Sequence, residues 1–139
     1  MFDKHPIQIL GIDFLKLFLE KNPNSDNDVL EQGDFQIHSM HSDFNQESSE
    51  IWVKVRCLIG FDDHSEKQKD ASFWLEVELE ACFSVDTEQF DPSNLPHWAQ
   101  SNATIVLYPY VREAVSSLSG KIFNKEHVVL PLLTVPTTK

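Results

Sequence analysis

The stretch SFWLEVELEACFSV, residues 72–85, alternates apolar and polar side chains almost without fault. Successive side chains of a strand point to opposite faces, so this pattern predicts a long strand with one dry face. The side chains predicted to face inward are Phe73, Leu75, Val77, Leu79, Ala81, Phe83 and Val85. Whatever fold the chain adopts must cover that face.

Three more stretches are predicted to be strands, and polar, turn-rich segments separate them. They lie at about residues 7–20, 34–43 and 51–61, of which the second has the weakest pattern. In the third, alternate residues again form an apolar set, namely Ile51, Val53, Val55, Cys57 and Ile59. The sequence therefore favours a four-stranded sheet.

A helix is predicted after the last strand, because the apolar period changes from two to 3.6. Its stripe consists of Leu107, Val111, Ala114 and Leu118. Asp91 with Pro92, or Asn94, can cap its start, and Gly120 is predicted to stop it. Pro109 lacks the N–H that would bond to the carbonyl of Ile105, so the helix is predicted to kink or break there.

Such a break would let two shorter helical pieces point in different directions, one on the sheet and one toward another subunit or beside a groove. A plain kink within a monomer is the alternative. The tail HVVLPLLTVPTTK, residues 127–139, holds two prolines in an apolar run, which favours an extended segment or lid over a second helix.

The areas of these elements predict an uncovered apolar surface. Four strands of about 12 residues present roughly 760 Å² per face. A helix of about 18 residues covers roughly 270 Å², about a third of that face. Soluble monomers rarely leave such patches open, so we expect another subunit or a ligand to cover the remainder.

Composition narrows the function classes for what we expect to be a single domain, residues 1–139. The 22 acidic residues against 11 basic ones give a net charge of -11, which argues against nucleic acid as a partner. The start of the chain does not resemble a signal peptide and no segment has membrane-spanning length, so we expect a cytoplasmic protein without membrane insertion.

No pattern in the sequence is typical of an enzyme or of a metal site. Cys57 and Cys82 form no CxxC pair, and His38 and His41 would face opposite sides of a strand. There is no Gly-rich phosphate loop and no Ser-His-Asp order. We therefore expect no catalytic residues, no metal and no cofactor.

Three stretches resemble the SecB family of protein-export chaperones: IQILGIDFLKLFLEKNPN, FWLEVELEACFSV and IVLYPYVREAVSSL. The resemblance spans about residues 7–135, and its specific part is Tyr108-Pro109-Tyr110-x-Arg112-Glu113. It implies an α+β fold in which a four-stranded antiparallel sheet precedes the helix. It also implies a homotetramer built as a dimer of dimers, and ATP-independent capture of unfolded polypeptides in hydrophobic grooves.

The resemblance also suggests a docking surface for a SecA-type translocation motor. Glu20, Trp74, Glu76 and Glu78 are the candidates, although Lys16 stands where the family has another acid. The alternative is a solvated face on which Glu76, Glu78 and Glu80 pair with Lys54 and Arg56. The family's further C-terminal helix is expected to be missing, and a SecB-like chaperone of a toxin–antitoxin system is a second possibility.

Candidate contacts for polypeptide clients lie on the helix and on the segment after it. They are Leu107, Tyr108, Tyr110, Val111, Val115, Phe123, Val129, Leu130, Leu132 and Leu133. Alternatively, most of these side chains form the core or a subunit interface. Three functions remain open: a general holdase, a dedicated chaperone of one partner such as an antitoxin, and a small-ligand carrier with a closed pocket between sheet and helix.

Overall fold

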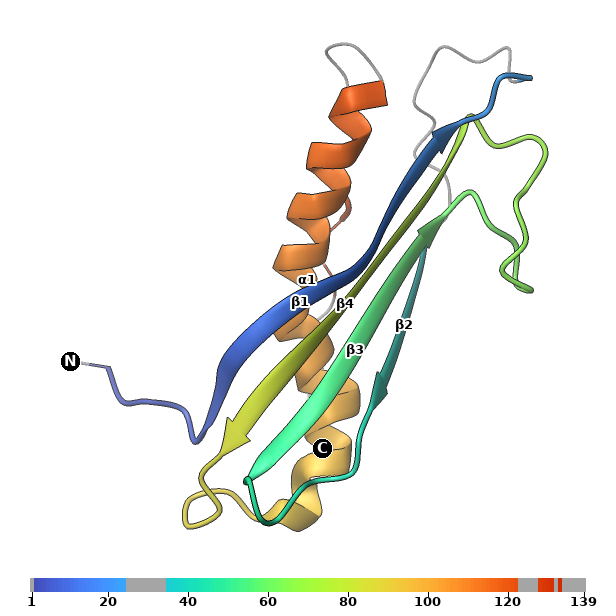
Figure 1. Ribbon diagram of the computed structural model, residues 1–139. Coiled ribbons are helices and arrows are strands. Elements are labelled where there is room, and N and C mark those ends of the chain that lie inside the picture. Colours follow the sequence, from blue (N-terminus) through green and yellow to red (C-terminus); the bar gives the residue numbers. More distant parts are fainter. Residues whose placement is uncertain (1, 25–34, 123–127, 132, 134–139) are drawn as a thin grey trace.

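The computed structural model describes residues 2–24, 35–122, 128–131 and 133. Its elements are β1 (Ile7–Lys21), β2 (Phe35–His41), β3 (Glu50–Ile59), β4 (Phe73–Val85), the 3-10 turn η1 (Pro92–Asn94) and α1 (Leu95–Ile122). The four strands form one antiparallel sheet in the order β1-β4-β3-β2. A single long helix, α1, crosses one face of it obliquely (Figure 1). The predicted α+β architecture is confirmed.

The core lies between α1 and the inward faces of β3 and β4. All seven side chains predicted to face inward on β4 are buried, as are the five on β3. On α1, the predicted stripe supplies Leu107, Val111 and Ala114 to this core, while Leu118 packs at its margin. The strict alternation of the two central strands therefore placed their side chains on the correct faces.

The edge strand β1 is less regular than the central strands. It pairs with β4 along its whole length, but the register shifts twice, between Ile9 and Gly11 and between Phe14 and Lys16. Each shift adds one residue to β1 that has no partner on β4, first Leu10 and then Leu15. Such bulges bend a strand and change which side chains share a face.

The predicted break at Pro109 is wrong, because α1 continues through that residue as one helix. Leu107 and Val111, on either side of it, are fully buried against the sheet. Pro109 itself lies on the exposed side, so one helical hydrogen bond is lost there while packing keeps the residues on both sides of it in the core. The predicted stop at Gly120 is also early, since α1 ends at Ile122.

The start of the helix follows the prediction more closely. Asp91 caps the 3-10 turn that leads into α1, its side chain accepting a hydrogen bond from the Ser93 backbone N–H. After α1, residues 128–131 are neither helix nor strand, and Val128 and Leu130 are buried. The predicted client contacts Phe123 and Leu132 lie outside the described residues.

Candidate functional site

The helix-facing side of β1 carries apolar side chains that the helix does not cover. Phe14 pairs with Leu79 and Leu17 with Val77 across the sheet, so both point to the same side as the core. Yet Phe14 is 42% exposed and Leu17 is 54% exposed. The reason is the position of α1, which packs mainly on β2, β3 and β4 and touches β1 least.

The edge of the sheet lies beside these exposed side chains. Among the described residues, β1 pairs only with β4, so its other edge has no strand neighbour. The two extra residues, Leu10 and Leu15, are also exposed. We call Leu10, Phe14, Leu15 and Leu17 the β1 apolar surface. It combines exposed apolar side chains with an open row of backbone donors and acceptors, which is an arrangement that pairs readily with another chain.

Half of the predicted client contacts are buried within the protomer. These are Leu107, Tyr108, Val111, Val115 and Leu130. Leu133 packs partly against the core. Tyr110 and Val129 keep about 45% of their surface exposed. Of the predicted contacts that the structure describes, those two have the most apolar surface to offer a partner.

Residues 128–131 are attached to α1 through their main chain. The Val128 N–H donates to the Ser119 hydroxyl at 2.7 Å, and the Arg112 Nε donates to the Leu130 carbonyl at 2.8 Å. The Tyr108 hydroxyl donates to the carbonyl of Pro131. Burial raises the pKa of Tyr108, so its hydroxyl keeps the proton that it donates. The Tyr-x-x-x-Arg part of the sequence signature thus holds the segment that follows the helix.

On the opposite face of the sheet, Glu76 is enclosed by two cations. It is 5% exposed, and its carboxylate lies 3.0 Å from the Lys16 ammonium and 2.8 Å from the Arg56 guanidinium. Burial acts to raise the pKa of Glu76, but the hydrogen bonds and charges of Arg56 and Lys16 outweigh it and hold that pKa below its usual value. Lys16, where the family resemblance led us to expect an acid, is therefore a partner of Glu76.

Glu20 is also paired within the chain. Its carboxylate lies 3.0 Å from the Lys67 ammonium, which sits 4.7 Å from the ring centre of Trp74 and 5.4 Å from that of Phe18. The fourth predicted motor contact, Glu78, is half-buried and lies opposite Arg56. Docking of a motor at this face stays a prediction, and for Glu76 the geometry favours the alternative of pairing across the sheet.

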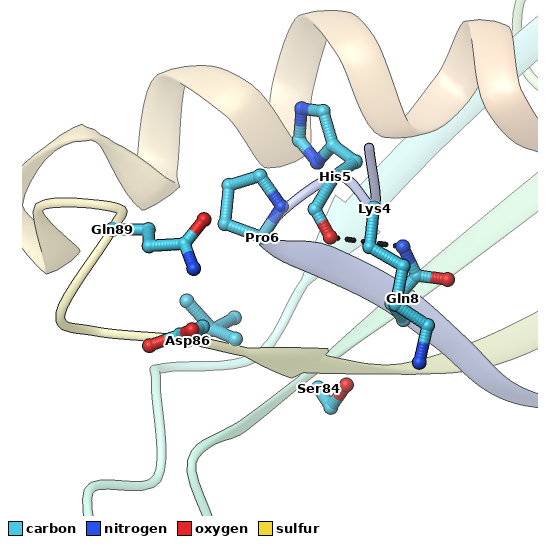
Figure 2. Close-up of a pocket in the computed structure, with 8 residues that line it drawn as sticks. Lys4, His5, Pro6, Gln8, Ser84, Asp86 and Gln89 are labelled. Atoms are coloured by element: carbon cyan, nitrogen blue, oxygen red, sulfur yellow. Dashed lines mark hydrogen bonds between the residues drawn. The ribbon is translucent and has the colours of Figure 1, made fainter. Parts of the chain in front are cut away.

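A pocket of about 330 Å³ lies at the start of β1 and the end of β4 (Figure 2). Six of its eight lining residues are of polar type, namely Lys4, His5, Gln8, Ser84, Asp86 and Gln89, and the other two are Pro6 and Val85. The Gln8 side chain donates to the His5 carbonyl across its wall. It is an open hollow beside the strand ends, unlike the closed sheet-helix pocket expected of a small-ligand carrier.

The chemistry of the remaining polar groups is limited. The described part of the chain contains no group of three or more metal-ligating side chains. Burial raises the pKa of the Cys57 thiol to about 12, so it is not a thiolate at neutral pH. None of the described helices is long and apolar enough to cross a membrane.

The β1 apolar surface was not among the sites predicted from the sequence. The signal was present, because residues 7–19 include apolar residues on both parities, which a regular strand cannot direct to one face. Two bulges resolve that conflict by resetting the alternation, so that Ile9, Phe14 and Leu17 share a face. The approximate area calculation had nevertheless predicted that some of the sheet would stay uncovered.

Comparison with solved structures identifies the fold. A SecB-like chaperone of Mycobacterium tuberculosis, solved in complex with a ChAD peptide from the HigA1 antitoxin, matches with a TM-score of 0.69 and 20% identity. The match covers 95% of this chain and 94% of that one. A Streptococcus agalactiae protein of unknown function matches with a TM-score of 0.48 and 6% identity over 90% of this chain and 96% of that one. No family model and no curated protein matches the sequence. The chain therefore has a SecB-like fold.

Proposed function

We propose that this chain is a SecB-like chaperone that holds non-native polypeptides on exposed apolar surface, without nucleotide. The observation that carries the proposal is that a protomer with a complete core still exposes large apolar side chains on β1 and on α1. Stable monomers bury such surface, and larger exposed patches mark interaction sites. The shared fold of a SecB-like chaperone supports the same function.

The two exposed regions serve different partners in this proposal. A second copy of the chain is the occupant of the β1 apolar surface, because an open strand edge beside an apolar face can pair with the same edge of another protomer. Two such dimers would form the homotetramer. The chain would act in the cytoplasm, with protein export as its general role.

Clients would bind along α1 and the segment after it. Val106 and Tyr110, four residues apart on α1, are both exposed, and Val129 adds a third exposed apolar side chain. Burying a large apolar side chain contributes about 1.5 to 3 kcal/mol, so several shallow contacts in series can hold an unfolded chain. The net charge of -11 would favour clients with basic residues and make their binding sensitive to salt.

A second candidate function is a dedicated chaperone of one partner, such as an antitoxin. It is favoured by the complex of the M. tuberculosis SecB-like chaperone with an antitoxin peptide. Both candidates use the same surfaces and differ in the breadth of their clients.

Aggregation assays with several unrelated denatured proteins separate the two functions. Protection of most of them supports a holdase, and protection of a single one supports a dedicated chaperone. Native mass spectrometry of the same samples reports assembly and capture together. A lone protomer that protects none of the substrates would refute the proposal.

A further inference from the structure

Three side chains on one flank of α1 contact the backbone of residues 128–131. Tyr108, Arg112 and Ser119 follow each other at spacings of four and seven residues, which places them along the same side of a helix. Tyr108 and Arg112 donate to main-chain carbonyls, and Ser119 accepts from a main-chain N–H. Their partners are therefore peptide groups, which every polypeptide offers regardless of its sequence.

We propose that this flank, the backbone clamp formed by Tyr108, Arg112 and Ser119, is a binding site for an extended polypeptide, and that residues 128–131 occupy it as an internal stand-in for a client. The proposal rests on the chaperone function proposed above and adds to it the chemistry of recognition and its control. Fixed donors and acceptors supply affinity for any extended main chain.

The side chains of the stand-in indicate which clients fit best. Val128 and Leu130 are buried against the core, whereas Val129, between them, points outward and is about half exposed. The site thus takes every second side chain, as expected for an extended segment on a surface. Preferred clients would carry an apolar-x-apolar pattern within an unfolded stretch.

An internal occupant sets a threshold for clients. Because the stand-in is part of the same chain, its effective concentration is high and does not change on dilution. A client has to outcompete it. Weakening the docking of residues 128–131 should therefore tighten client binding, which is the reverse of what loss of an ordinary binding residue does.

Leu130 is the side chain to change, since it is 2% exposed, and Met40 on β2, an exposed apolar residue outside the client surface, is the control. The probe is a fluorescein-labelled peptide with the sequence of residues 127–133, HVVLPLL, followed by fluorescence anisotropy with the full-length protein. Leu130→Ser should bind it at least about tenfold more tightly than the unaltered protein, given the apolar surface lost. Met40→Ser should bind it like the unaltered protein.

Adding Arg112→Gln to Leu130→Ser should remove the gain, because a main-chain carbonyl of the peptide then loses the Arg112 guanidinium as its donor. Equal affinity of the unaltered protein and Leu130→Ser would overturn the proposal. So would a gain that survives Arg112→Gln, since the peptide would then bind elsewhere.

A measurement on the unaltered protein covers the case in which Leu130→Ser fails to fold. The Val128 amide is bonded to Ser119 and should exchange slowly with deuterium. Saturating peptide should accelerate its exchange about tenfold or more by displacing the stand-in. Unchanged or slower exchange contradicts displacement.

The same proteins distinguish failure of this inference from failure of the chaperone function. If the peptide displaces residues 128–131 but the protein does not protect denatured proteins from aggregation, the backbone clamp is supported and the holdase function is refuted. If the unaltered protein and Leu130→Ser protect denatured proteins equally and the peptide displaces nothing, the holdase function is supported and the backbone clamp is refuted.

Discussion

Replacing Phe14 and Leu17 together by serine should prevent assembly and leave the protomer folded. Both residues point to the helix side of β1 but remain 42% and 54% exposed, so their outer halves contribute little to the core. In a symmetric dimer each substitution counts twice. Scaling about 1.5 to 3 kcal/mol per fully buried side chain by these exposed fractions gives a loss of about 3 to 6 kcal/mol of association free energy.

That loss corresponds to a dissociation constant about 10² to 10⁴ times higher. Native mass spectrometry and sedimentation velocity across a dilution series measure it directly. Met40→Ser is the control, because Met40 is an exposed apolar residue on β2, the opposite edge of the sheet. The double variant of Phe14 and Leu17 should keep the circular dichroism spectrum of the unaltered protein, which shows that its protomer is folded.

Assembly of the double variant that matches the unaltered protein at every concentration would refute the reasoning about β1. A lone protomer in the unaltered protein would refute it equally, since the exposed surface would then need no second copy.

Three other measurements check separate parts of the structure. Tyr110→Ser should weaken client capture about three- to tenfold without changing assembly, because about 45% of that residue is exposed and available for burial; unchanged protection in aggregation assays would place client contacts elsewhere. Pro109→Ala should raise the free energy of unfolding by up to about 3 kcal/mol in urea titrations, since it restores an N–H inside a continuous helix, and destabilisation would show that the proline is needed there. The folded-state pKa of Glu76 is depressed, so its contribution to stability is present above the ordinary carboxyl range and is lost as the pH falls through the lowered pKa. Glu76→Gln should therefore reduce the loss of unfolding free energy between neutral and acidic pH, measured in unfolding curves. An unchanged loss would assign the acid sensitivity to other carboxylates.

The sequence was most informative where one physical rule determined the structure. In β3 and β4, strict alternation placed the inward side chains correctly because both strands have a neighbour on each side and pack one apolar face against α1. The cap at Asp91 followed from the chemistry of a side chain that bonds the next turn. These features are local and need no knowledge of the rest of the chain.

The errors arose where packing competed with a local rule. Pro109 should disrupt a helix by itself, but the buried Leu107 and Val111 hold both sides of it on the sheet. The exposure of Phe14 depends on where α1 lies across the sheet, which the helical period alone does not determine. Which residues of the Tyr108 to Glu113 signature act on the following segment became visible only when that segment was seen beside the helix.

The Glu76 carboxylate bridges three strands, since Lys16 belongs to β1 and Arg56 to β3. This has a consequence for alignment during folding. Because β1 has apolar residues on both faces, a register shifted by one residue along β4 would still bury apolar atoms. That shift would place Lys16 on the other face of the sheet, away from the Glu76 carboxylate. We therefore infer that the ion pairs of Glu76 with Lys16 and Arg56 fix the register of β1 on β4. Their loss would give a less stable sheet and a mixture of strand registers.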